Sequence, residues 1–244
     1  MVEVITEIIG RTEEGRGILQ PFRCMAADGN MYFAKGSNTT RQGLIREWVC
    51  ANLGQVFGLP IPDVKILLLS EGLRDLSDLS WSKDLEYDYL FGTTSVEPCE
   101  VISFSDISNV PIAVRRDLLV FDAWIRNDDR YLTEKGGNPN VLIKIPERDA
   151  YIIDHNNAFA ADFDCKSVRD LHVFSESLYT NPIDLADMGQ YGERFDECLR
   201  HLDNICSQLP EEWIQISIEE DATIQLIRRT LEKHSDEDFW GWLT

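Results

Sequence analysis

Two aspartates and one asparagine in the middle of the chain have the types and the spacing that phosphoryl transfer needs. Asp129 follows an apolar helical pattern, Asn140 opens a short apolar run, and Asp154 ends the next one. A phosphoryl-transfer enzyme uses one carboxylate to orient the acceptor hydroxyl and take its proton. It uses an Asn and a second Asp to hold Mg2+ against nucleotide phosphates. The order of these residues therefore predicts a site for Mg2+-dependent phosphoryl transfer.

Regular elements must bring these side chains together. Residues 110–125 predict a helix with an apolar face, and Asp129 lies just past its end. The fourteen positions from Asn140 to Asp154 fit a hairpin with its turn at residues 146–149. Such a hairpin places two oxygen ligands on neighbouring strands, where a hard cation binds. The structural alternative is a capped helix end for Asp129 and a polar turn for Asp154.

The first third of the chain predicts a small lobe of strands with one helix. Strands are expected at residues 2–9, 18–25, 31–35 and 64–69. Apolar residues at helical spacing begin at Leu44, and the segment 58–62, rich in Gly and Pro, ends the helix.

This lobe has its own candidate site residues. Lys35 ends a predicted strand and Glu47 lies on the predicted helix, so the two could form the ion pair that holds a lysine against nucleotide phosphates. Gly15 and Gly17 lie in the turn between the first two strands, where backbone N–H groups can approach phosphates. The structural alternatives are a solvated Lys and Glu and an ordinary turn.

The remainder of the chain is mostly helical in pattern. Residues 70–108 show no clear period and are expected to connect two lobes, while residues 192–209 and 217–234 predict helices separated by Pro210. The expected fold is therefore α+β and bilobal, with an N-lobe at residues 1–90, a C-lobe at residues 91–244 and a cleft between them.

Composition excludes several classes of partner. The chain has 244 residues, 43% of them hydrophobic, and a formal net charge of -20. So much negative charge opposes direct binding to nucleic acid or to an anionic membrane. No basic leader or apolar run of membrane-spanning length is present, so a cytoplasmic location is expected. The six scattered cysteines are expected to be reduced and mostly buried. Nothing in the sequence indicates the oligomeric state.

Taken together, these residues resemble the HipA-like kinase family, and more distantly the phosphoinositide kinases. The resemblance covers roughly residues 5–165. In the second half of that range it rests on Asp122-Ala123-Trp124 through Asn127-Asp128-Asp129-Arg130, on Asn138-Pro139-Asn140-Val141-Leu142, and on Ile153-Asp154-His155 with Ala158-Phe159. In the first half it rests on Gly15-Arg16-Gly17 with Gln20-Pro21-Phe22, on Phe33-Ala34-Lys35, and on Leu44-Ile45-Arg46-Glu47 through Leu59-Pro60-Ile61-Pro62.

The resemblance implies a protein-kinase-like fold and a role for each matched position. Asp129 would be the catalytic residue, with Arg130 bracing its loop. Asp154 would be the principal Mg2+ ligand and Asn140 the second, with Asn138 as a rival to Asn140. The nucleotide-binding residues would be Lys35, Glu47, Gly15 and Gly17.

Two departures from the family pattern stand out. Between Asp129 and Asn140 the chain has a longer insertion than compact kinases, and Tyr131 occupies the place where a His often follows the Asp-Arg pair. The serine-containing regulatory loop of the family's toxins has no obvious counterpart, so toxin activity is not inferred.

The expected activity is transfer of the γ-phosphoryl group of ATP, with Mg2+, to a protein hydroxyl, as in Ser/Thr kinases of this family. A basic or neutral acceptor segment suits the acidic surface. Four alternatives stay open: a small-molecule or lipid kinase, a pseudokinase that binds nucleotide without catalysis, an interaction module without nucleotide affinity, and transfer of AMP in place of phosphate.

Overall fold

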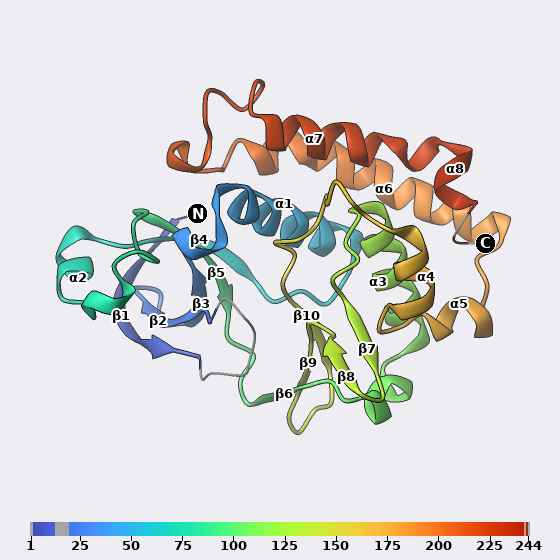
Figure 1. Ribbon diagram of the computed structural model, residues 1–244, viewed down its shortest axis with the longest axis horizontal. Helices are drawn as coiled ribbons and strands as arrows, with labels where there is room; N and C mark the ends of the chain where they lie inside the picture. The colour runs from blue at the N-terminus through green and yellow to red at the C-terminus, as the bar shows by residue number, and fades with distance from the viewer. Residues whose placement is uncertain (1, 13–19, 242, 244) are drawn as a thin grey trace.

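The computed structural model describes residues 2–12, 20–241 and 243. Strands gather in the N-terminal part and helices in the C-terminal part, so the expected mixed α+β class is confirmed (Figure 1). A layer formed by α6 (Leu185–Cys206) and α7 (Ala222–Leu231) lies along one side of the molecule. The short helices are α2 (Glu71–Asp75), α4 (Cys165–Leu171), α5 (Glu176–Thr180) and α8 (Glu237–Trp240).

The N-terminal part is built on a closed five-stranded barrel. Its strands are β1 (Val2–Arg11), β2 (Phe22–Ala26), β3 (Met31–Lys35), β4 (Val64–Leu68) and β5 (Tyr89–Thr94), in the order β1-β2-β3-β5-β4. Neighbours pair antiparallel except β1 and β4, which are parallel and close the barrel. Phe22, Tyr32 and Leu90 fill the interior, so the end of β3, which carries Lys35, is held in a rigid wall.

Strand β5 lies in the segment whose sequence showed no period. It pairs with both β3 and β4, and its central residues are buried, which removes the alternation that marks a half-exposed strand. A Cβ at Gly92 would lie 2.4 Å from Leu67 Cδ1, so only glycine lets the two strands pack here. Because β5 runs through residue 90, barrel residues lie on both sides of the expected lobe boundary.

Helix α1 (Arg41–Phe57) confirms the single helix expected in the first third of the chain. The Thr40 side chain accepts a hydrogen bond from Gly43 N at its start, and Gly58, with a φ of 94°, ends it. Most of its length is buried, because the barrel covers one side and the C-terminal helices another. Buried packing therefore fixes the direction in which Glu47 points.

Helix α3 (Ile112–Trp124) and a hairpin form the second half of the framework. The helix was expected at 110–125 and begins two residues later because Pro111 precedes it. Strands β9 (Val141–Lys144) and β10 (Ala150–Ile152) confirm the expected hairpin. A hydrogen bond from Ile153 N to Asn140 O, 3.1 Å, extends the pairing to the residues that flank the strands. Asn140 and Asp154 therefore lie at the same end of the hairpin.

The insertion between Asp129 and Asn140 is itself a hairpin. Strands β7 (Tyr131–Thr133) and β8 (Gly136–Asn138) pair so that Tyr131 lies opposite Asn138. A Cβ at Gly137 would lie 2.3 Å from Tyr131 O, so a glycine is required at this close approach. The short strand β6 (Cys99–Val101) completes the β9–β10 sheet on its other edge. The insertion thus returns the chain to the segment that carries Asp129.

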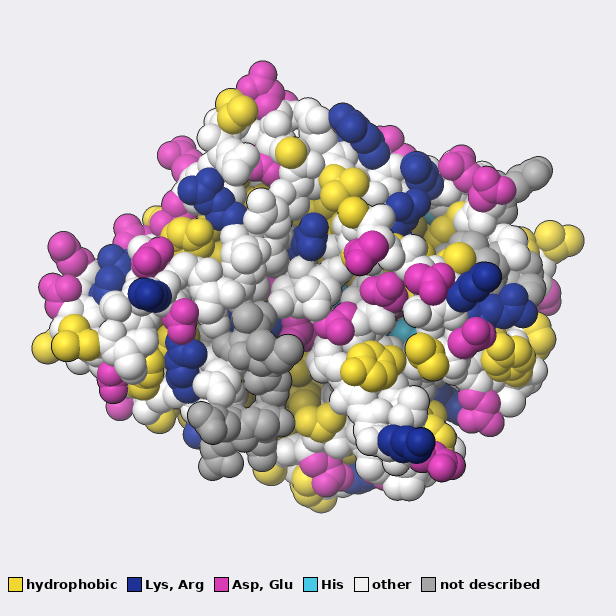
Figure 2. Space-filling view, in the orientation of Figure 1, with side chains coloured by type: hydrophobic (Ala, Val, Ile, Leu, Met, Phe, Trp, Pro, Cys, Tyr) yellow, Lys and Arg dark blue, Asp and Glu magenta, His cyan; other side chains and the backbone are white. Residues whose placement is uncertain are grey.

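Surface charge and cysteine burial can be compared with the expectations of an acidic surface and of mostly buried cysteines. Acidic side chains are spread over both halves of the face shown in Figure 2. Four of the six cysteines, Cys24, Cys50, Cys198 and Cys206, are buried. Within the described part of the chain, no helix has the length and apolar character needed to cross a membrane.

Candidate active site

Lys35, Glu47 and Asp154 meet at the junction of the barrel, α1 and the β9–β10 hairpin. Lys35 Nζ donates to Glu47 Oε1 and, over 2.8 Å, to Asp154 Oδ1. The second Glu47 oxygen accepts the backbone N–H of His155 over 3.0 Å. Residues that lie 119 positions apart in the chain, Lys35 and Asp154, are therefore in direct contact. The expected Lys35–Glu47 ion pair is confirmed.

The charged groups of this cluster shift one another's pKa values. Burial opposes the ionised form of Asp154, but the charge of Lys35 outweighs it and lowers the pKa of Asp154 to about 2. Burial likewise opposes the charged form of Lys35, but the carboxylates of Asp154 and Glu47 raise its pKa. Burial raises the pKa of Glu47, an effect that Lys35 counteracts and Asp154 reinforces. Asp154 is thus an ionised carboxylate, the form in which it can bind a cation.

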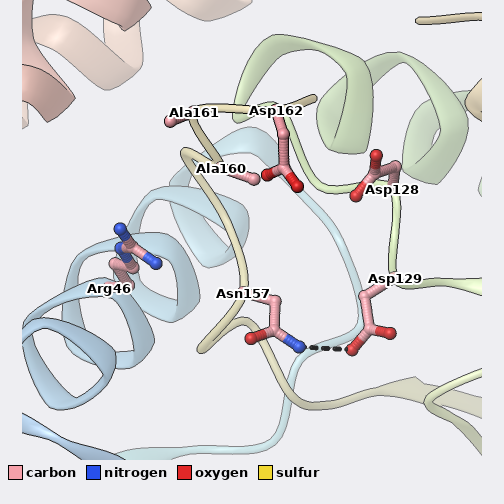
Figure 3. Close-up of a pocket in the computed structure, with 7 residues that line it drawn as sticks. All are labelled: Arg46, Asp128, Asp129, Asn157, Ala160, Ala161 and Asp162. Atoms are coloured by element: carbon pink, nitrogen blue, oxygen red, sulfur yellow. Dashed lines mark hydrogen bonds between the residues drawn. The ribbon is translucent and has the colours of Figure 1, made fainter. Parts of the chain in front are cut away.

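Asp129 is oriented by two asparagine amides. Asn138 Nδ2 donates to Asp129 Oδ2 over 3.1 Å, and Asn157 Nδ2 donates to the same oxygen over 2.7 Å (Figure 3). The β7–β8 hairpin supplies the first amide and the segment after Asp154 supplies the second. The sequence offered Asn138 only as a metal ligand, and the donated amide shows that its side chain is engaged with Asp129. Asn157 was not singled out, although it lies close after Asp154.

Asn140 and Asp154 have the chemistry of a Mg2+ site. Both supply oxygen donors, and both have left-handed backbones, with φ values of 48° and 63°. Such strain gathers at functional sites, and Asn and Asp tolerate it best among residues with side chains. No group of three or more His, Cys, Asp or Glu suited to a metal occurs among the described residues. Mg2+ fits this donor set because it commonly takes one or two protein ligands and completes its shell with phosphates and water.

Arg130 braces the loop that carries Asp129 from inside the protein. Its side chain is fully buried, and Nε donates to Asp122 Oδ2 over 2.6 Å. Nη1 donates to the carbonyls of Asn140, 2.6 Å, and Ile153, 3.0 Å. Arg130 therefore ties α3 to the open end of the hairpin, just before β9 and just after β10, and as a fully buried side chain it supports the site indirectly.

Asp122 is the buried counter-charge of this brace. Besides Arg130, it accepts the Asn127 amide over 2.9 Å and contacts His172 Nε2 at 3.0 Å. Burial opposes its ionisation, but Arg130 and His172 lower the pKa of Asp122 to about 2. In the sequence, Asp122 is a carboxylate within an apolar helical pattern, eight positions before Arg130, and nothing in that pattern showed that the two side chains pair.

A cavity of about 520 Å³ opens beside Asp129. It is lined by Arg46, Asp128, Asp129, Asn157, Ala160, Ala161 and Asp162 (Figure 3). Arg46 lines it from α1, and Ala160 and Ala161 have only methyl groups to fill it. The Asp129 carboxylate is thus accessible through the cavity to a group that enters from solvent.

Gly15 and Gly17, the expected phosphate-contacting glycines, lie outside the described residues. Of the described residues nearby, Thr12 N donates to Pro21 O over 3.1 Å. Among the other expected site residues, the structure brings Lys35, Glu47, Asp154, Asn140, Asn138, Asp129 and Arg130 into one region of the molecule.

His155 allows a prediction about pH and stability. Its ring is 1% exposed, stands edge-on to Phe121, and has no hydrogen-bond partner for Nε2 among the described residues. Burial lowers the pKa of His155 to about 3, whereas an unfolded chain has a value near 6.5. Between these values the unfolded chain binds more protons, so acid favours unfolding, by about 2 kcal/mol at pH 5.

Denaturant unfolding at pH 8 and pH 5 measures this effect. His155→Phe, which keeps a ring in the same space, is expected to lose that part of the pH dependence. His201→Gln, at an exposed position on α6, is the control and is expected to keep it. Equal pH dependence in His155→Phe and the unaltered protein would show that His155 does not resist protonation.

Comparison with protein families decides where the chain belongs. A family model described as "HipA-like kinase" matches residues 5–243. The chain belongs to the HipA-like kinase family. The match extends beyond the segment that carried the resemblance and includes the C-terminal helices. The coarse expectation of a kinase-like protein is therefore confirmed.

A solved structure supports the same fold. The crystal structure of a Helicobacter pylori proinflammatory kinase, CtkA, aligns with a TM-score of 0.54 over 93% of this chain and 92% of that chain, at 11% sequence identity. At this identity the likeness establishes a fold shared with that kinase and nothing about substrates. The search of curated proteins found no match.

Proposed function

We propose that this HipA-like kinase binds MgATP and transfers its γ-phosphoryl group to a hydroxyl of a protein acceptor. The observation that carries the proposal is the contact of Lys35 with both Glu47 and Asp154. These residues come from separate elements, and their assembly is the arrangement that fixes a lysine on nucleotide phosphates beside a Mg2+ ligand.

In this proposal Asp154 and Asn140 hold Mg2+, which neutralises charge on the phosphates. Lys35 binds the phosphates, and Glu47 keeps the Lys35 amine in place. Backbone N–H groups around Gly15 and Gly17 are proposed to contact the phosphates as well. The contribution of these residues is alignment and charge stabilisation, which account for most of the catalysis of phosphoryl transfer.

Asp129 is proposed to accept the proton of the acceptor hydroxyl. Asn138 and Asn157 both bind one carboxylate oxygen, Oδ2, and no hydrogen bond to the other oxygen, Oδ1, occurs among the described residues. Oδ1 can therefore accept a hydrogen bond from the acceptor, which enters through the cavity beside Asp129. The size of that cavity suits a side chain on an extended segment, and its carboxylates favour a basic or neutral segment.

Two labels distinguish the transferred group. The protein is incubated with Mg2+ and ATP labelled either at the γ- or at the α-phosphate, with a panel of Ser-, Thr- and Tyr-containing peptides of basic, neutral and acidic sequence. The proposal expects γ-label on the peptides or on the protein itself, with ADP as the product. Transfer of α-label would show AMP transfer instead, and absence of both labels in the presence of bound nucleotide would show a pseudokinase.

A further inference from the structure

Helix α6 spans both halves of the candidate active site. In Figure 1 it runs along one side of the molecule, above α1 and α3. Trp48 on α1 donates its indole N–H to the carbonyl of Ile205 on α6 over 3.0 Å, in a buried position. Cys198 Sγ on α6 lies 3.5 Å from the carbonyl of Leu53 on α1. Helix α1, which carries Glu47, is therefore attached to α6 along much of its length.

Arg194, on α6, joins three helices at one point. Its guanidinium donates through Nη2, 2.5 Å, and Nε, 3.2 Å, to the carbonyl of Phe57, the last residue of α1. Through Nη1, 2.9 Å, and Nη2, 2.8 Å, it binds both oxygens of Asp117 on α3. The guanidinium also stacks over the Phe57 ring, 3.8 Å from the centroid, and Tyr191 donates to Asp117 over 2.9 Å.

These contacts constrain the two halves relative to each other. Helix α1 positions Glu47 and through it Lys35, while α3 leads into the loop of Asp129 and anchors Arg130, which donates to the backbone carbonyl of Asp154. A bidentate guanidinium–carboxylate pair fixes direction as well as distance, and a cation suits the carbonyl end of a helix. Rotation of α1 against α3 would break both sets of bonds to Arg194 together.

We propose that Arg194 is a positioning residue that keeps the contact of Lys35 with Glu47 and Asp154 assembled before any ligand binds. Helix α6 then holds α1 in place within this chain, without a binding partner or a covalent modification. The expected effect of Arg194 on MgATP affinity rests on the proposed function. The expected effect of Arg194 on the position of Lys35 does not.

The segment after α6 attaches the C-terminal layer to the start of strand β5 as well. Glu212 accepts the backbone N–H of Asp88, 3.1 Å, and of Tyr89, 2.5 Å, and Trp213 donates to the carbonyl of Tyr89 over 3.1 Å. Strand β5, which begins at Tyr89, is thereby fixed to the C-terminal layer. Helix α1 and strand β5 are thus both held by α6 and the residues that follow it.

The reactivity of Lys35 reports the assembly directly, without nucleotide. In the assembled cluster its amine is buried and hydrogen-bonded, so an amine-acylating reagent modifies it slowly. Labelling rates are measured by mass spectrometry in the unaltered protein, in Arg194→Met, and in Asp117→Asn, which keeps shape but weakens the pair. Both variants are expected to label Lys35 about tenfold faster, because local opening of α1 exposes the amine.

Two controls separate positioning from general loosening. Arg200→Met alters an exposed arginine on the same helix whose ion pair is with Glu197, and Leu178→Ala destabilises the C-terminal part at α5, away from α1. Neither is expected to accelerate Lys35 labelling. Equal labelling of Lys35 in Arg194→Met, Asp117→Asn and both controls would overturn the proposal, as would acceleration of the same size in Leu178→Ala.

Titration of MgATP into the same proteins separates this inference from the proposed function. Arg194→Met is expected to bind MgATP about tenfold more weakly than Arg200→Met, because a misplaced Lys35 contributes less to phosphate binding. An unaltered protein without affinity for MgATP contradicts the proposed function alone. The Lys35 labelling rates decide the role of Arg194 in either case.

Discussion

Asp129→Asn is expected to lower the rate of phosphoryl transfer by about 10²–10⁴-fold and to leave MgATP affinity unchanged. The substitution keeps the shape of the side chain but removes the group that takes the acceptor proton. Asp129 contacts Asn138 and Asn157, whereas Lys35 contacts Asp154 and Glu47. Nucleotide binding and proton transfer are therefore assigned to different carboxylates, and ADP production at saturating MgATP measures the second.

Asp128→Asn is the matched control for this prediction. Asp128 is the neighbouring carboxylate, lines the same cavity, and accepts a hydrogen bond from Asp164 N over 3.2 Å. We expect a much smaller loss of rate in this variant. An Asp129→Asn protein that turns over at the unaltered rate, or a loss of equal size in Asp128→Asn, would contradict the assignment of Asp129.

Arg130→Met is expected to lower the free energy of unfolding by about 3–5 kcal/mol, the cost of leaving a buried charge without its partner. Among the described residues, the Asp122 side chain would retain only Asn127 and His172 as partners, and the carbonyls of Asn140 and Ile153 would lose a donor. Denaturant unfolding followed by tryptophan fluorescence measures the loss, since Trp124 lies on the same helix as Asp122.

A double variant tests the reason for that loss. Asp122→Leu combined with Arg130→Met removes both charges, and replacing a buried pair by apolar groups costs less than breaking it. The double variant is therefore expected to be more stable than Arg130→Met alone. If Arg130→Met lowers stability by less than about 1 kcal/mol, the value of an ordinary exposed ion pair, then Arg130 does not brace the loop.

The parts of the site that the sequence predicted were those marked by local pattern. Asp154 ends an apolar strand and Asn140 opens one, so the alternation and the turn at residues 146–149 were enough to place them together. Lys35 and Glu47 were expected as a pair from the order of strand and helix, and their contact confirms it. The closed barrel that contains β3 could not be predicted from the sequence, because its closure depends on pairing between strands that are distant in the chain, β1 and β4.

The parts that were missed depend on contacts distant in sequence. Strand β5 lacks alternation because it is buried in the middle of the barrel, and Gly92 within it reads as a turn residue. Arg194 is 137 positions from Phe57, and on α6 it has the pattern of an ordinary surface arginine. The contact of the Asn138 amide with Asp129 was not expected from the sequence, because it depends on the β7–β8 hairpin, which turns this amide toward Asp129.

The most direct test of the account is calorimetric titration of ATP into the protein with and without Mg2+, in parallel with Asp154→Asn. Asp154 is ionised and faces Lys35, and its replacement keeps the shape but removes the charge that binds the cation. The account predicts saturable binding that requires Mg2+ and is lost in Asp154→Asn. Equal affinity with and without Mg2+, or unchanged affinity in Asp154→Asn, would contradict the central claim that this cluster is a Mg2+-dependent nucleotide site.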